Sequence, residues 1–487
     1  MISFDSIPLD NRTPGVFVEI DATRATGGLP STGQRILVIG QRLAAGAVAA
    51  LVPTRIVTAG QAAQAFGRGS RLALMLAALK TANDATECWA IALDDAGAGV
   101  AATGTITVAG PATAAGAIAL RIDGIAVPVA VPAGATAAQV ATAIAAAVNA
   151  LPDLPVTAAA AAAVVTLTAR NKGTAGNDID LRANFYQGEQ LPAGIGLVLA
   201  AMAGGAANPD IGLAFAALGD AQYPTLVLPF ADAGTLAAVD AELGARSGPM
   251  RMIESMAYGG LRGSPGALAA IGAARNGPYV SLIGAKASPT HPSCWAAAYA
   301  GQIAFYGGID PARPFQTLAL PGVLAPAIPD RFSHAERELL LRDGISTFTV
   351  DAGGTVLIER AITTYQVNAQ GIEDIAYLDV NTPLTLFYLR RAVRSRIALK
   401  FPRHKLADDR ANFGAGQNVV TPKIIRAELL ALFRDLEEAG LVEDLDQFKA
   451  DLIVQRNAAD PNRVDALIPP NIVNQLRVFA GRVEFRL

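Results

Sequence analysis

The chain of 487 residues has little of the chemistry on which most enzymes depend. Aromatic residues make up 6% and charged residues 17% of it, and it has only three histidines and two cysteines. The histidines His291, His334 and His404 are distant in sequence from one another and from the cysteines, so they lack the spacing of a metal site. Cys88 and Cys294 each adjoin a tryptophan in apolar surroundings, which favours buried free thiols over a disulfide or a metal pair.

The sequence motifs that mark nucleotide binding and hydrolysis are also missing. No Walker A sequence, no H-E-x-x-H, no G-x-S-x-G and no C-x-x-C occurs. The glycine pairs at residues 67–69 and 97–99 lack a third glycine in register, so they only weakly support a dinucleotide site. Ser264, in the sequence R-G-S-P-G, resembles a turn before a helix more than a nucleophile. We therefore expect no catalysis and no cofactor, although a triad assembled in space would leave no such motif.

Charge and hydropathy exclude two further classes of partner. The net charge of −3 predicts no affinity of the whole chain for nucleic acid. The most apolar region, residues 133–165, is interrupted by polar residues and prolines, so we expect no membrane insertion. Residues 1–5 have neither a basic segment nor an apolar one, so we expect no secretory signal.

What is present is an alternation of apolar strands and helices that predicts an α/β core. Residues 35–40, 87–93, 225–229 and 279–284 are short apolar runs typical of buried parallel strands. We also expect a helix over residues 61–80, a helix over 266–274 and a strand over 250–256. This spacing favours a three-layer α/β domain with a mostly parallel sheet, formed by residues 34–99 and 208–335.

Residues 100–207 interrupt the α/β pattern with almost no aromatics and much Ala, Gly, Thr and Val. Strands are expected at 105–108, 117–122, 125–131 and 164–169, with a hairpin turn at Asp123 and Gly124. Thr136 is a plausible N-cap for an alanine-rich helix. We interpret this segment as an inserted α+β domain that is peripheral to the core.

The remainder of the chain predicts an α+β C-terminal domain over residues 336–468. Residues 346–351 and 355–359 have the pattern of antiparallel strands, and residues 383–399 and 422–439 that of helices. The chain ends are assigned to extended arms, with an N-terminal arm and linker at residues 1–33 and a C-terminal arm at 469–487.

Both arms contain an alternating polar and apolar pattern that is typical of a half-buried strand. In the N-terminal arm the strand residues are Val16, Phe17, Val18, Glu19 and Ile20. In the C-terminal arm they are Arg482, Val483, Glu484, Phe485, Arg486 and Leu487. Such strands need partners for their backbone groups, and the partner lies either in the same domain or in a neighbouring subunit.

A basic stretch in the C-terminal domain is the one marked charge feature. Arg390, Arg391 and Arg394 lie within one face of a predicted helix, in a segment that contains no acid. They form a solvated helix face, they pair with the acidic residues 435–446 of the same domain, or they form a docking face for an acidic partner.

Three ordered blocks of sequence resemble the contractile tail sheath proteins of Mu-type bacteriophages and related prophages. The first is G-G-I-D-P-A-R-P-F-Q-T-L-A-L-P-G-V at residues 307–323. The second is L-K-F-P-R-H-K-L-A at 399–407, followed by F-G-A-G-Q at 413–417 and T-P-K at 421–423. The third comprises residues 456–463 and 469–477. The resemblance extends over most of the chain except the insert.

This resemblance implies a structural subunit of a contractile sheath rather than an enzyme. Such subunits stack as six-fold rings around an inner tail tube, and their terminal arms add strands to the C-terminal domains of neighbours. The C-terminal domain would face the tube, which places Arg390, Arg391 and Arg394 near it, and the insert would lie outside. The implied partners are further copies, the tube, the baseplate and a tail terminator, in a virion tail assembled in the host bacterial cytoplasm. An α/β enzyme or binding module with an unrecognised site is the alternative.

Overall fold

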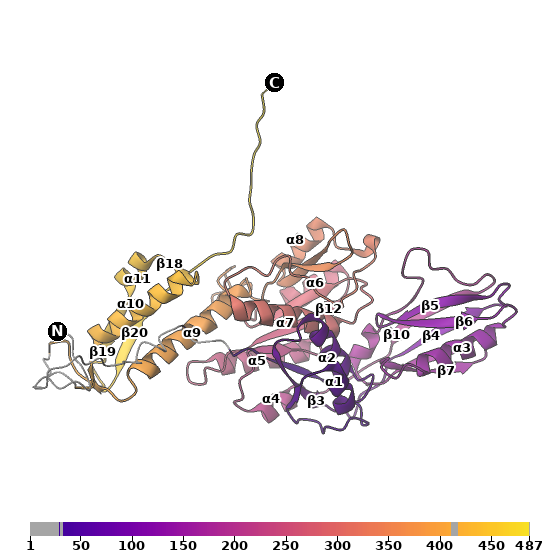
Figure 1. Cartoon of the computed structure of the whole chain (residues 1–487), viewed down its shortest axis with the longest axis horizontal. Helices are drawn as coiled ribbons and strands as arrows, with labels where there is room; N and C mark the ends of the chain where they lie inside the picture. The colour runs from indigo at the N-terminus through magenta and orange to yellow at the C-terminus, as the bar shows by residue number, and fades with distance from the viewer. Residues whose placement is uncertain (1–28, 30–32, 411–416, 487) are drawn as a thin grey trace, which may run out of the picture. The chain divides into compact units, whose positions relative to one another are not determined.

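A computed structural model describes residues 29, 33–410 and 417–486, which divide into two compact units at Pro383 and Leu384 (Figure 1). The first unit is built on an eight-stranded sheet with the order β15-β14-β13-β12-β11-β1-β3-β2. The strands from β14 to β3 are parallel to their neighbours, and the two edge strands are antiparallel. The strand bounds are β1 (Arg35–Gln41), β2 (Thr54–Ile56), β3 (Glu87–Leu93), β11 (Thr225–Val227), β12 (Met256–Arg262), β13 (Val280–Ala285), β14 (Ile345–Val350) and β15 (Val356–Arg360).

Helices cover both faces of this sheet, which makes it the three-layer α/β core that the sequence predicts. Ser281 of β13 hydrogen-bonds to Tyr299 of α7, whereas Gly284, which points the other way, leaves room for Leu268 of α6. Helix α2 packs against α7 and so shares its face. The helices are α1 (Ala59–Phe66), α2 (Arg71–Ala82), α4 (Gly212–Leu218), α5 (Ala233–Ser247), α6 (Pro265–Ala273), α7 (Pro292–Ile309) and α8 (His334–Arg342), with a 3₁₀ turn η2 (Ile328–Asp330).

Two elements of the core differ from the sequence-based prediction. The helix expected over residues 61–80 is two helices, because Gly67 and Gly69 adopt φ values of 90° and 78°, which turn the chain between α1 and α2. The strand expected over 250–256 is wrong, since Met252 has a positive φ of 53° within a turn and the strand begins only at Met256.

The large sheet also extends further along the chain than expected. Strand β14 pairs in parallel with β13, so residues 345–360 belong to the core sheet rather than to a domain that starts at 336. The segment 317–320, inside the first block of the sheath resemblance, covers the outer edge of β15. Thr317 N–H donates to Ile358 O (2.8 Å) and Leu320 N–H donates to Val356 O (2.8 Å). This pairing protects an edge that would otherwise be open to other strands.

The insert is a small β-sandwich with one helix, drawn in purple and magenta in Figure 1. Its sheets have the orders β10-β4-β8-β7 and β6-β5-β9, and α3 packs against strands of both. Thr136 and Gln139 form a capping box at the start of α3, which confirms the predicted N-cap. The bounds are β4 (Thr103–Ala109), β5 (Gly116–Ile122), β6 (Ile125–Val131), α3 (Ala137–Asn149), β7 (Val156–Ala161), β8 (Val164–Ala169), η1 (Thr174–Asp178), β9 (Leu181–Ala183) and β10 (Gly196–Ala203).

The second unit is a helical domain with three small two-stranded sheets. Its core centres on Phe433 and Phe448, whose rings stack with centroids 4.0 Å apart. Helix α9 (Asn381–Lys400) begins in the first unit and continues into the second. The other elements are β16 (Lys405–Leu406), β17 (Val419–Val420), α10 (Pro422–Glu438), β18 (Val442–Glu443), α11 (Leu445–Asp451), β19 (Ile453–Arg456), β20 (Val464–Leu467) and β21 (Asn471–Ile472). No helix in the described part of the chain is long and apolar enough to cross a membrane.

Candidate assembly surfaces

Beyond β21, which pairs with β18, the C-terminal arm is exposed and has no strand partner within the described part of the chain. Residues 473–486 lie in no helix or strand, and Figure 1 draws them as a bare trace that ends at the label C. The side chains of Val483 and Phe485 are 91% and 80% exposed. The strand predicted from Arg482 therefore does not pair within its own domain over residues 482–486, and Leu487 lies outside the described residues. Exposed apolar residues at alternate positions are typical of a strand whose partner is another chain.

The predicted N-terminal strand, Val16, Phe17, Val18, Glu19 and Ile20, lies wholly outside the described residues. Nothing in the structure tests its pairing, so it stays a prediction.

Small sheets in the second unit offer edges to which an arm strand could be added. Strands β19 and β20 form an antiparallel pair from Ile453 opposite Leu467 to Arg456 opposite Val464. No third strand joins this pair among the described residues. Ile453 and Leu467, which lie opposite each other at one end of the pair, are both exposed. A two-stranded sheet is marginally stable alone and gains from a further strand.

The basic stretch on α9 divides into paired and unpaired arginines. Arg396 is half-buried and bonds to Glu428 of α10 (Nη1 to Oε1, 2.9 Å) and to Asp435. Burial disfavours its charge, but the bonds to both carboxylates raise its pKa above the usual value. Pairing within the domain, one of the sequence-based alternatives, thus holds for Arg396.

Two of the three predicted tube-facing residues, Arg391 and Arg394, differ from Arg396. Arg394 is exposed and Arg391 is half-buried, and neither forms an ion pair with any residue that the structure describes. Arg390 is half-buried. Burial raises the pKa of the Tyr388 hydroxyl, and the nearby Arg391 partly opposes that shift. Arg391 and Arg394 therefore remain available to an acidic partner.

A buried ion pair, which the sequence analysis missed, joins the insert to the core. Arg71 at the start of α2 places Nη1 2.9 Å from Oδ2 of Asp123 in the β5–β6 turn of the insert. Their side chains are only 4% and 2% exposed. Asn171, in the loop after β8, accepts a hydrogen bond from Arg71 N–H (2.9 Å) and donates one to Arg42 O (2.9 Å). The insert is consequently anchored by buried polar contacts and not only by its two connections.

Further buried contacts lie at the carboxyl edge of the parallel strands. His291 Nε2 is 2.9 Å from Ala175 O of η1, and Arg262 at the end of β12 donates to Asp178 O (2.8 Å). Burial, reinforced by the charges of Arg71 and Arg262, holds the pKa of His291 well below its usual value. Burial raises the pKa of Asp178.

A cavity of about 300 Å³ at this edge is lined by residues of both core and insert, including Asp178, Asp232, Arg262 and His291. Doubly wound folds bind ligands at this edge of the sheet. Here η1 of the insert forms part of the wall, and Arg262 and His291 are committed to its backbone carbonyls. Across the described part of the chain, no group of three or more His, Cys, Asp and Glu side chains could hold a metal ion.

The two cysteines are free and buried, as the sequence predicts. Burial raises the pKa of both Cys88 and Cys294 to about 12, so neither thiol is reactive near neutral pH.

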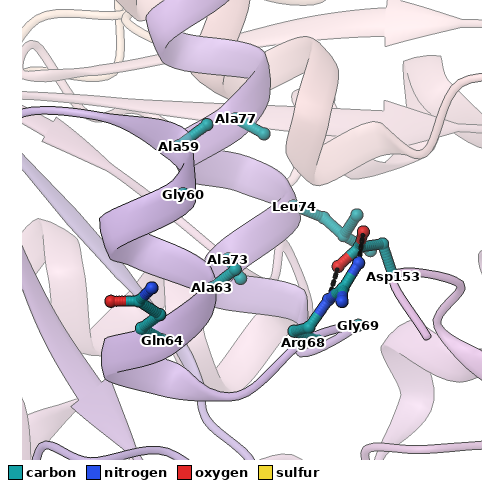
Figure 2. A pocket seen from close by; sticks show the side chains of 10 residues that line it. All are labelled: Ala59, Gly60, Ala63, Gln64, Arg68, Gly69, Ala73, Leu74, Ala77 and Asp153. Atoms are coloured by element: carbon teal, nitrogen blue, oxygen red, sulfur yellow. Dashed lines mark hydrogen bonds and ion pairs between the residues drawn. The ribbon is translucent and has the colours of Figure 1, made fainter.

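A surface hollow between α1 and α2 is shown in Figure 2. Its volume is about 480 Å³, and its wall is mainly small and apolar. Arg68 and Asp153 form a two-pronged ion pair on one side, with Nε–Oδ1 and Nη2–Oδ2 distances of 2.8 and 2.6 Å. The hydrogen bonds from Arg68 hold the pKa of Asp153 below its usual range. The apolar lining residues are Ala59, Gly60, Ala63, Ala73, Leu74 and Ala77.

Comparison with known proteins identifies this combination of domains. Three family models match consecutive parts of the chain: the phage tail sheath β-sandwich domain at residues 97–196, the sheath central domain at 204–364 and the sheath C-terminal domain at 373–486. Over 486 residues the chain is 43% identical to the Mu-like prophage FluMu tail sheath protein of Haemophilus influenzae, and the match covers 100% of both chains.

Solved structures match the chain at much lower identity. The sheath tail protein of Listeria innocua matches with a TM-score of 0.50 at 14% identity, over 93% of this chain and 94% of that one. The sheath tail protein of Desulfitobacterium hafniense matches with a TM-score of 0.48 at 15% identity, over 94% of this chain and 100% of that one.

An α/β core that carries a β-sandwich insert and continues into a C-terminal domain is the domain arrangement of phage tail sheath proteins. The chain belongs to the phage tail sheath family. It is a structural subunit of a contractile tail sheath, and hence a component of a virion tail.

Proposed function

We propose that the subunit polymerises as stacked six-fold rings around an inner tail tube, held together by strands that the terminal arms donate to neighbouring subunits. The exposed C-terminal arm carries this proposal, because Val483 and Phe485 alternate with polar residues and have no partner among the described residues. The edges of β19 and β20 that no described strand covers offer backbone groups to which such a strand could bond. Backbone hydrogen bonds to an added strand depend little on the side chains through which the folded domains of neighbouring subunits contact each other.

This arrangement lets the lattice shorten without falling apart. Donated strands keep neighbouring subunits connected while the contacts between their folded bodies repack. The extended sheath is then a metastable state, and contraction to a state with more buried surface drives the tube through the host envelope. The subunit performs no catalysis in this mechanism.

The second unit faces the tube in this proposal, and Arg391 and Arg394 supply its electrostatic contact. Exposed charge pairs are individually weak, at about 0.2–1 kcal/mol each, but they repeat in every ring. Weak and screened contacts hold the tube in register and still release it on contraction. The remaining partners are the baseplate and a tail terminator, with assembly in the host bacterial cytoplasm and no contact with nucleic acid.

Negative-stain electron microscopy of the purified protein tests the proposal. Tubes or stacked rings in the absence of other phage proteins support it. Discrete monomers or dimers at all concentrations and salt conditions would contradict it and favour a binding module or enzyme instead.

A further inference from the structure

A loop in the first unit, residues 367–376, displays two isoleucines that the fold itself does not bury. Ile372 is 63% and Ile375 74% exposed, and the acidic Glu373 lies between them. We call this segment the isoleucine loop. Exposed apolar side chains at neighbouring positions of one loop are typical of a contact surface rather than of ordinary solvent-facing chain.

The isoleucine loop is held in one conformation before any partner binds. Asp374 accepts a hydrogen bond from the Tyr365 hydroxyl (2.6 Å), and this bond raises the pKa of Tyr365 to about 12. Asn276, just beyond α6, donates to Val367 O (2.8 Å) and accepts from Val367 N–H (3.0 Å). Asn368 N–H donates to Ile372 O (2.9 Å) across the turn. A preorganised loop loses little conformational entropy on docking, which favours binding.

The same unit carries a receptor of complementary shape, the hollow between α1 and α2 (Figure 2). We call it the alanine groove, defined by Ala59, Gly60, Ala63, Ala73, Leu74 and Ala77. Its volume of about 480 Å³ is enough for two isoleucine side chains. At its rim, Arg68 bonds to Asp153 through Nε and Nη2, and its Nη1 has no hydrogen-bond partner among the described residues. That nitrogen is free to receive a carboxylate that arrives with an apolar group.

Loop and groove are attached to parts of the eight-stranded sheet, near β14 and near β1, that three strands (β13, β12 and β11) separate. The isoleucine loop is fixed to the end of α6, since Gln366 donates to Gly272 O (2.9 Å), and α6 packs near β14. The alanine groove lies on α2, which packs near β1 and on the α7 face. The loop of one chain therefore does not reach its own groove. A contact between two such different surfaces is head-to-tail, and its repetition produces an open chain of subunits.

We propose that the isoleucine loop of one sheath subunit docks in the alanine groove of a second copy. Ile372 and Ile375 fill the apolar floor, and Glu373 meets Arg68 at the rim. This contact rests on the proposed polymerisation, but it is separate from strand donation because it joins two folded bodies.

Replacing both isoleucines tests the contact in the full-length protein. Ile372→Ser with Ile375→Ser should raise the concentration needed for tube formation about tenfold or more, since each isoleucine loses the burial it gains on docking. Ile328→Ser is the matched control, because Ile328 is a similarly exposed isoleucine of the same unit. Circular dichroism and thermal unfolding should be unchanged in both variants. Tubes from the double variant at the wild-type concentration would overturn the contact while leaving strand donation intact.

Cysteine cross-linking identifies the two surfaces directly. Mild oxidation of tubes of the Ile375→Cys, Ala63→Cys variant should give a ladder of covalent multimers on a denaturing gel. The native cysteines do not interfere because both are buried. Ile328→Cys with Ala63→Cys should give no ladder. If tubes form but the first variant yields no multimers, while a thiol reagent labels both sites in the unassembled protein, the assigned pair of surfaces is wrong.

Discussion

The guanidinium of Arg71 and the carboxylate of Asp123 meet at 2.9 Å in the interior of the first unit, 52 residues apart in sequence. One belongs to the first turn of a core helix and the other to a hairpin turn of the insert. The second carboxylate oxygen of Asp123 has no hydrogen-bond partner, so the pair depends on Arg71 for neutralisation. The β-sandwich is thereby fixed to the core at a buried point as well as through its two connections.

Removal of Arg71 should strongly destabilise the first unit. Arg71→Met leaves Asp123 as a buried and unpaired charge, which typically costs about 3–5 kcal/mol. Urea unfolding followed by tryptophan fluorescence measures this effect, because both tryptophans, Trp89 and Trp295, belong to the first unit. Arg68→Met, which breaks the exposed pair with Asp153, is the control and should change stability little. Equal effects of the two substitutions would contradict the role assigned to the buried pair.

Replacing residues 100–207 with a short Gly/Ser linker should leave tube formation intact but weaken the core. The replacement removes the partners of Arg71, Arg262 and His291 and leaves these side chains in a partly apolar site. Adding Arg71→Met to the replacement should recover part of the lost unfolding free energy, in contrast to its effect in the full chain. No soluble folded protein from either version would show that the insert is part of the core rather than peripheral to it.

The stability of the first unit should decrease below about pH 6.5 through His291. Its pKa in the folded protein lies well below that of an unfolded histidine, so the unfolded state takes up a proton first as the pH falls. The unfolding free energy should then drop by about 1.4 kcal/mol per pH unit from this group. The raised pKa of Asp178 acts in the opposite direction at lower pH. His291→Gln should flatten the slope between pH 6.5 and 5 in urea unfolding, and an unchanged slope would exclude His291 as its source.

Charge reversal tests the tube-facing assignment. Sheath with Arg391→Glu and Arg394→Glu should still polymerise, but it should nucleate poorly on purified tail tubes, because an acidic tube surface would repel the altered face. Lys423→Glu with Arg434→Glu, two exposed positions on α10, is the control of equal charge change. Turbidity or microscopy of tube-templated assembly at low and moderate salt gives the readout. Normal templated assembly together with a loss of monomer stability would show that Arg391 and Arg394 act within their own domain.

Local patterns predicted most of the core, and they failed where long-range pairing determines the structure. The apolar runs at 35–40 and 87–93 correspond to β1 and β3, since a buried parallel strand has a clear apolar signature. Strand β7 (Val156–Ala161) was missed because V-T-A-A-A-A has a composition typical of helices. It is a strand because it forms a hairpin with β8.

The assembly surfaces, too, were predictable only where their signal is a local pattern in the sequence. The alternation in residues 482–486 is a local pattern, and it marks an arm that the structure leaves exposed. Arg396 could not be distinguished from Arg394 in sequence, because only the position of Glu428 on a second helix separates them. The Arg71–Asp123 pair gave no sequence signal, since Asp123 next to Gly124 is ordinary turn chemistry.

Deletion of residues 482–487 followed by negative-stain electron microscopy tests the central claim most directly. If the C-terminal arm donates a strand to a neighbouring subunit, the truncated chain should remain a folded monomer by circular dichroism and should form no tubes at concentrations where the full chain polymerises. A variant that keeps the length but replaces only Arg482 and Arg486 with serine preserves the apolar face, and it should still form tubes. Tubes of normal length from the truncated chain would contradict strand donation by this arm.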